Sequence, residues 1–136
     1  MSFVVDVSVA LPWNVASQAT ALTRLAADLV VANGALVPFH FHLEYCNAAL
    51  MLLRRKRLSR IDFDTAIANI RDLDLAVDSV PFGDIDEAWL PLAITHRLTV
   101  YDAAYLELAL RTGLPLATRD RDLAAAARDA GAVLLA

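Results

Sequence analysis

The stretch Phe3-Val4-Val5-Asp6-Val7 is short, apolar and rich in β-branched residues, which is typical of a buried strand. Downstream, apolar residues recur at helical spacing over residues 17–31, with Ser17 as the expected N-cap and Asn33-Gly34 as the stop. A second short apolar run, Ala35–Pro38, then predicts another strand. A strand, a helix and a strand in this order favour a parallel sheet, because the helix returns the chain to the same sheet edge.

The rest of the chain continues this alternation. Helices are predicted over residues 39–54, 60–73, 84–96, 102–111 and 120–130, and strands over residues 76–80, 114–118 and 132–135. Ser59 with Asp62, and Asp84 with Glu87, look like capping boxes at two of the helix starts. No repeat or low-complexity linker interrupts the pattern, so residues 1–136 are expected to form one α/β domain with a mainly parallel sheet covered on both faces.

The amino-acid composition favours a globular protein without disulfide bonds or a membrane span. Apolar residues make up 58% of the 136 residues, which favours a globular chain and allows part of its surface to be covered by a partner. The single cysteine, Cys46, excludes a disulfide framework and is expected to be buried in an apolar helix. No apolar run reaches the roughly 20 residues of a membrane span, and no signal peptide is evident, so a cytoplasmic protein is predicted.

Four acids are placed where the predicted fold could bring them together. Asp6 lies near the end of the first strand, and Asp120 follows a later strand that ends at Thr118. Glu44 and Asp102 lie in the first turns of helices. Because functional sites of parallel sheets form beyond the carboxyl ends of the strands, these four carboxylates are expected to face one crevice.

Clustered carboxylates repel one another and are tolerated when a cation compensates their charge. Ligands that are all oxygen suit Mg²⁺ or Mn²⁺, which can activate water for hydrolysis of a phosphodiester. A concentrated acidic metal site would also reconcile a net charge of −4 with a nucleic-acid substrate. Structural roles are open for three of the acids, since Glu44 could pair with His40 and both Asp102 and Asp120 could cap helices.

Four segments resemble the PIN domain, and specifically the VapC-like ribonuclease toxins of toxin–antitoxin pairs. The matching segments are residues 4–8, 44–50, 98–109 and 116–123. The resemblance implies a three-layer α/β/α sandwich and a Mg²⁺- or Mn²⁺-dependent endoribonuclease. It implies that the metal-binding and catalytic residues are Asp6, Glu44, Asp102 and Asp120, with Ser8, Thr118 and Asp122 in auxiliary positions.

The resemblance also implies partners: a cognate antitoxin, an RNA substrate and a second copy of the chain in a homodimer. Candidate contacts to RNA phosphates are the basic residues Arg54, Arg55, Lys56, Arg57, Arg119 and Arg121. The run from Arg54 to Arg57 has an equally good structural reading, because cations are favoured at the carboxyl end of a helix.

Other readings of the same residues stay open. An aspartyl-phosphate enzyme would use Asp6 but normally has a second acid where this chain has Ser8. A transition-metal site could use His40, His42 and Glu44, although such sites usually draw on distant ligands as well. The main alternative from another class is a non-catalytic PIN-like module that dimerises and binds an antitoxin or RNA.

Overall fold

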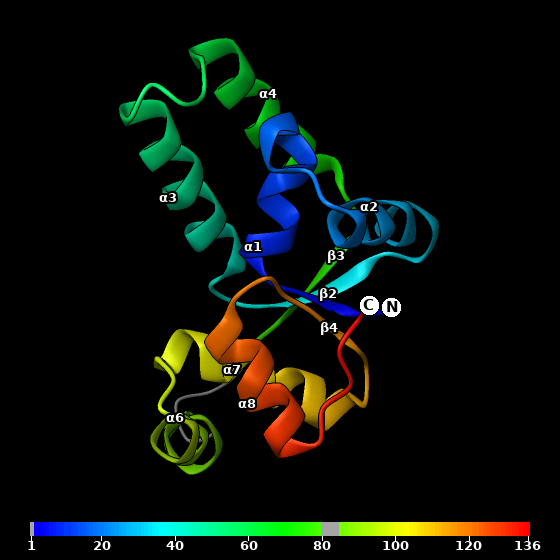
Figure 1. Cartoon of the computed structure of the whole chain (residues 1–136), viewed down its shortest axis with the longest axis vertical. Helices are drawn as coiled ribbons and strands as arrows, with labels where there is room; N and C mark the ends of the chain where they lie inside the picture. Colours follow the sequence, from blue (N-terminus) through cyan, green and yellow to red (C-terminus); the bar gives the residue numbers. More distant parts are fainter. Residues whose placement is uncertain (1, 80–84) are drawn as a thin grey trace.

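The computed structural model describes residues 2–79 and 85–136, and its centre is a four-stranded parallel sheet of order β3-β2-β1-β4 (Figure 1). The strands are β1 (Val4–Val5), β2 (Ala35–Pro38), β3 (Leu75–Asp78) and β4 (Leu116–Ala117). In the register of the sheet, Val4 lies opposite Leu36 on one side and Leu116 on the other. All strands run the same way, so their carboxyl ends share one edge of the sheet.

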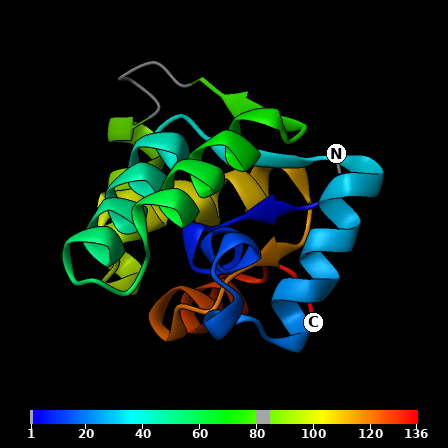
Figure 2. The ribbon, with the colours of Figure 1, turned by 90° about the horizontal axis from the view of Figure 1, so that it is seen from above.

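Helices cover both faces of this sheet, as predicted. Figures 1 and 2 show α1 to α4 on one side of the sheet and α6 to α8 on the other. The helices are α1 (Val7–Ala10), η1 (Leu11–Asn14), η2 (Ala16–Gln18), α2 (Ala21–Asn33), α3 (Phe41–Arg54), α4 (Arg60–Asp72), η3 (Ile85–Trp89), α6 (Leu90–His96), α7 (Val100–Thr112) and α8 (Arg121–Ala130). The expected three-layer α/β/α architecture is confirmed, and no helix among the described residues is long and apolar enough to cross a membrane.

β1 lies inside the sheet, in the core of the protein. Phe3, Val4 and Val5 are completely buried, because β1 is covered by helices on both faces and has a strand on each side. Tyr45 of α3 and Tyr105 of α7 fill the core from the two helical layers. The continuous apolar run at Phe3, Val4 and Val5 therefore predicted this buried strand correctly.

Two local predictions about the first 30 residues were wrong. The first strand ends at Val5 rather than Val7, because the Asp6 side chain accepts a hydrogen bond from the Ser8 amide and starts α1. Helix α2 begins at Ala21 and its N-cap is Thr20, while Ser17 lies in η2. Thr20 and Thr23 form a reciprocal capping box in which threonine replaces the usual Glu or Gln, so the sequence signal was weak.

Later predictions mostly agree with the structure. The Ser59 cap and the Gly113 and Gly131 helix stops are confirmed, whereas the predicted start at Asp84 and the strand end at Val80 lie outside the described residues. The segment 132–135 pairs beside β4 through one parallel bridge between Leu134 and Leu116.

Cys46 is exposed, contrary to the sequence prediction. The buried face of α3 carries Phe41, Tyr45 and Ala49, spaced by four residues. Cys46 follows Tyr45 by one residue, which turns its side chain about 100° away from that face.

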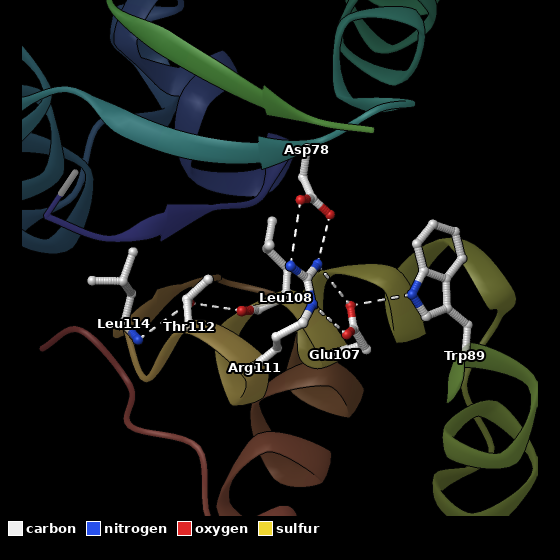
Figure 3. Close-up of polar contacts among 7 residues, drawn as sticks. All are labelled: Asp78, Trp89, Glu107, Leu108, Arg111, Thr112 and Leu114. Carbon is white, nitrogen blue, oxygen red and sulfur yellow. Dashed lines mark hydrogen bonds and ion pairs between the residues drawn. The ribbon is translucent and has the colours of Figure 1, made fainter. Parts of the chain in front are cut away.

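A network of ion pairs and hydrogen bonds connects the edge strand β3 to α7 (Figure 3). Arg111 of α7 donates to both carboxylate oxygens of Asp78, with a shortest distance of 2.6 Å, and to Glu107 at 2.7 Å. Glu107 also accepts a hydrogen bond from the Trp89 indole at 3.2 Å. The network holds α7 against the last residue of β3, and α7 carries Asp102 and Tyr105.

Candidate active site

Asp6 is the most buried acid of the predicted quartet. It follows β1 directly and is only 5% exposed. Its carboxylate accepts hydrogen bonds from the hydroxyls of Ser8 (2.8 Å) and Thr118 (2.6 Å). Burial raises the pKa of Asp6, these hydrogen bonds oppose that rise, and the nearby Asp120 adds to it.

The sheet register explains how Thr118 reaches Asp6. Val5 lies opposite Ala117 in the β1–β4 pair, so the next residue of each strand falls at the same edge. The Ser8 hydroxyl also accepts a hydrogen bond from the Arg119 amide at 2.8 Å. Ser8 and Thr118 therefore hold the Asp6 carboxylate in place through hydrogen bonds.

Glu44 lies in the first turn of α3, and its partner comes from α7. The Tyr105 hydroxyl donates to Glu44 at 2.6 Å, and the His40 imidazole lies 3.5 Å away. Burial raises the pKa of Glu44, and the charges of Asp6 and Asp102 add to the rise. Sequence reasoning missed Tyr105, although its position three residues after Asp102 puts both on one helix face.

Asp102 lies in the first turn of α7, where its amide donates to the Thr99 hydroxyl at 3.1 Å. Burial raises the pKa of Asp102 to about 6, and the charges of Asp120 and Asp6 contribute to this rise. Thr99 is the N-cap of α7, and a hydrogen bond between its side chain and the Asp102 carboxylate opposes part of the rise in pKa. A cap is therefore present at this helix start, with Thr99 as the capping residue.

Asp120 makes hydrogen bonds through both its side chain and its backbone amide. Its side chain caps α8 by accepting from the Leu123 amide at 2.9 Å, and its own amide donates to the Thr118 hydroxyl at 3.0 Å. Its charge raises the pKa of both Asp6 and Asp102. The structure thus brings the four predicted acids close enough to interact electrostatically, from β1, α3, α7 and the β4–α8 junction.

Asp122 is less closely attached to this cluster. It is exposed in the first turn of α8, and its charge is the smallest contribution that raises the pKa of Asp102. It lines a separate hollow together with His96 and Asp129, which lie 3.4 Å apart. The structure therefore places Asp122 at the border of the acid cluster.

The predicted RNA-contacting residues fall into two groups. Arg119 and Arg121 flank Asp120, and the Arg119 guanidinium donates to the Gln18 carbonyl at 3.3 Å. The run Arg54–Arg57 lies at the opposite end of α3 from Glu44, and ten residues of helix correspond to about 15 Å. The structure does not bring this run to the acids, and Arg54 lies in the last turn of α3, as a helix-end role requires.

The metal that the acid cluster implies is a hard divalent cation such as Mg²⁺ or Mn²⁺. Among residues 2–79 and 85–136, no three Asp, Glu, His or Cys side chains are already arranged as a metal-binding group. This finding also gives no support to the alternative site at His40, His42 and Glu44. The donor chemistry nevertheless fits a hard divalent cation, because the four acids offer only oxygen and no cationic side chain of the described residues forms an ion pair with Asp6, Asp102 or Asp120.

The protein is an α/β/α sandwich, and carboxylates from four of its segments lie near the carboxyl edge of the sheet. Comparison with known families identifies the class of protein that has this arrangement. Residues 3–129 match the PIN domain, and the chain belongs to the PIN domain family. It is homologous to Exonuclease VapC9 of Pyrobaculum aerophilum, with 33% identity over 89 residues. That match covers 65% of this chain and 66% of VapC9, just under two thirds of the relative's length.

Two solved structures share the fold. PAE2754 from Pyrobaculum aerophilum aligns with a TM-score of 0.68 and 23% identity, over 93% of this chain and 84% of that one. VapC20 of Mycobacterium tuberculosis, described as a toxin that cleaves the sarcin-ricin loop, aligns with a TM-score of 0.67 and 21% identity over 98% of both chains. At these identities the two structures establish the fold.

Proposed function

We propose that this chain is a Mg²⁺- or Mn²⁺-dependent endoribonuclease that acts as the toxin of a toxin–antitoxin pair, with residues 1–136 forming a single nuclease domain. The observation that carries the proposal is that no cationic side chain of the described residues forms an ion pair with Asp6, Asp102 or Asp120, although the charges of Asp6 and Asp120 raise the pKa of Asp102. Carboxylates that repel one another in this way are stabilised by a cation. Homology to VapC9, whose name describes an exonuclease, supports nuclease chemistry.

In this proposal Asp6, Glu44, Asp102 and Asp120 hold the cation and are the catalytic residues. The bound cation would supply an activated water and compensate charge on the phosphodiester. Ser8 and Thr118 fix the orientation of the Asp6 carboxylate, and Tyr105 fixes that of Glu44. Such hydrogen bonds prearrange ligands that would otherwise be pushed apart by repulsion.

The proposed partners are a cognate antitoxin, an RNA substrate and a second copy of the chain. Large apolar side chains exposed on the surface support protein partners, among them Val31 (80%) and Ile94 (78%). For RNA, Arg119 and Arg121 are the favoured phosphate contacts because they flank Asp120. Asp122 is proposed as an auxiliary acid, and Arg54–Arg57 as a more distant contact for an extended RNA.

The test is cleavage of RNA by purified chain free of antitoxin, with Mg²⁺, with Mn²⁺ and with EDTA. Total cellular RNA would identify targets, and a circular RNA would distinguish internal cleavage from the end-directed activity in the name of VapC9, because a circle has no end. We expect discrete, metal-dependent cuts in both, and their loss in Asp6→Asn and Asp102→Asn. A matched control, Asp28→Asn, changes an exposed acid of α2 and should cleave normally.

The competing function is a PIN-like module that binds an antitoxin or RNA without cutting. Retention of RNA binding by a folded chain that cleaves neither substrate under any metal condition would support that function over ours. Cleavage of linear RNA alone would make the chain an exonuclease and contradict the endonuclease part of the proposal.

A further inference from the structure

A hollow of about 340 Å³ opens beside Glu44, between the starts of α3 and α7. It is lined by His40, Leu43, Glu44, Asn47 and Tyr101. Its volume lies at the lower end of the range for small-molecule pockets. Glu44 lines this hollow and also belongs to the acid cluster, so a group bound in the hollow would lie near the proposed cleavage position.

Aromatic rings form one wall of this hollow. Tyr101 directly precedes Asp102 and is 63% exposed, and its ring lies 5.5 Å from the ring of buried His40. Next to them, the ring of Phe39 is 49% exposed and stacks on Trp89 at 5.7 Å. Exposed aromatic faces beside a nucleic-acid site are the surfaces on which unpaired bases stack.

The remaining lining combines apolar Leu43 with the polar residues His40, Glu44 and Asn47. His40 is 6% exposed, and burial lowers its pKa while a hydrogen bond with the Tyr101 backbone opposes that change. The Nε2 atom lies 3.5 Å from Glu44 without hydrogen-bond geometry. Asn47 is exposed on the next turn of α3 and offers both a donor and an acceptor.

We propose that this hollow binds one unpaired nucleobase of the RNA substrate, next to the phosphodiester that is cut, with Tyr101 stacking on the base and Asn47 contacting its edge. The proposal rests on the proposed function, since its ligand is the substrate of that site. A planar ring with polar edges matches a hollow that has an aromatic wall and polar groups at its rim. A base in a duplex could not enter, so the hollow would select single-stranded RNA or loops.

Another occupant of the same face would be a second copy of the chain, because Leu43 and Tyr101 are both exposed. Asn47 argues against an apolar contact, since burying its exposed amide under a partner's apolar side chains would leave it without hydrogen bonds. A base edge would satisfy this amide while its ring covers Tyr101.

The test compares two probes of equal length on full-length protein in EDTA, where RNA stays intact. One probe is a fluorescent single-stranded RNA of mixed sequence, and the other is an abasic strand with the same number of phosphates. Wild type should prefer the base-bearing strand by roughly five- to a hundredfold in Kd, which is the usual range for stacking on an aromatic side chain. Tyr101→Ala should lose most of this preference, Tyr101→Trp should keep it, and Asn47→Ala should reduce it.

The matched control is Ile61→Ala, which truncates an exposed apolar side chain (79% exposed) on α4, outside the hollow. It should bind both probes like wild type. Light scattering on every variant would report the oligomeric state. An unchanged preference in Tyr101→Ala overturns the proposal, and if that variant also dissociates a wild-type dimer, the face belongs to a second copy.

Different results would overturn the base-binding proposal and the nuclease proposal. Metal-dependent cleavage by a Tyr101→Ala protein whose base preference equals that of wild type would overturn only the base-binding hollow. A wild-type chain that neither binds Mn²⁺ nor cleaves RNA, but keeps a Tyr101-dependent base preference, would overturn only the nuclease.

Discussion

Asp102 is the acid whose ionisation depends most clearly on the fold. Its pKa rises from 3.8 to about 6, first because of burial and then because of Asp120 and Asp6. The folded chain therefore binds the proton more tightly than the unfolded chain, and the ionised carboxylate destabilises the metal-free fold. That loss of stability is complete above the folded pKa and disappears as the pH falls through about 6 towards 3.8.

We therefore expect Asp102→Asn to raise the Tm of EDTA-treated protein at pH 8, with a gain that shrinks steadily between about pH 7 and pH 4. Thermal unfolding followed by circular dichroism across this pH range measures the gain. Asp28→Asn, which changes an exposed acid of α2, should show no such trend. A gain for Asp102→Asn that is constant with pH would mean that the Asp102 charge is not the cause.

Tyr105 is the residue that connects the two helical layers at the site. Its ring is completely buried and its hydroxyl donates to Glu44 at 2.6 Å. Tyr105→Phe keeps the packing and removes only this bond. We expect it to weaken Mn²⁺ binding and RNA cleavage by about tenfold, as for other partners of metal ligands.

Tyr45→Phe is the matched control for this experiment. Tyr45 is equally buried, but its hydroxyl bonds to Asn14 and to the Ala66 carbonyl, away from the acids. It should lower the stability of the fold and leave Mn²⁺ affinity unchanged. If the two variants reduce cleavage equally while neither changes Mn²⁺ affinity, the Tyr105 hydroxyl contributes only to the stability of the fold and does not position Glu44.

At the scale of elements, the turn between α2 and β2 sets where the sheet begins. Gly34 ends α2 with φ +72° and ψ 178°, a backbone conformation that is essentially confined to glycine and costs other residues about 1–3 kcal/mol. A Cβ at this position would also lie 2.9 Å from the Asp74 carbonyl, just before β3. Alanine therefore cannot be accommodated here without moving the backbone that aligns β2 with β3.

We expect Gly34→Ala to destabilise the protein by roughly 1–3 kcal/mol more than Gly113→Ala, measured by chemical denaturation. Gly113 has nearly the same φ, +71°, but nothing lies within 4 Å of its missing Cβ. Gly113 has ψ 8°, in the left-handed region, so the comparison measures the combined cost of the backbone conformation and of the clash at Gly34. Equal losses in the two variants would show that neither has an additional cost.

At the scale of the whole molecule, the sequence predicted those parts of the fold that follow from the spacing of apolar residues. The buried strand at Val4 and Val5 and the stops at Gly34 and Gly113 follow from local chemistry. The register of the sheet then brings Asp6 beside Thr118, so the rule that sites form at carboxyl strand ends was enough to group the acids.

What the sequence did not reveal depends on side chains that meet across elements. The Tyr105–Glu44 bond, the exposure of Cys46 and the burial of His40 all depend on how far α3 and α7 are rotated about their axes. Apolar patterns give such rotations only coarsely, because a helix with both faces partly apolar fits several orientations. The distance of Arg54–Arg57 from the acids likewise became clear only from the direction of α3.

The central claim is that acids from four segments form one site for a divalent cation. Calorimetric titration of Mn²⁺ into metal-free protein tests it most directly, with Asp6→Asn, Asp102→Asn and the control Glu107→Gln, whose acid on α7 pairs with Arg111 instead. We predict saturable binding to wild type and Glu107→Gln, and its loss in both Asp variants. Binding that survives in Asp6→Asn and Asp102→Asn, or no binding to folded wild type, would contradict the claim.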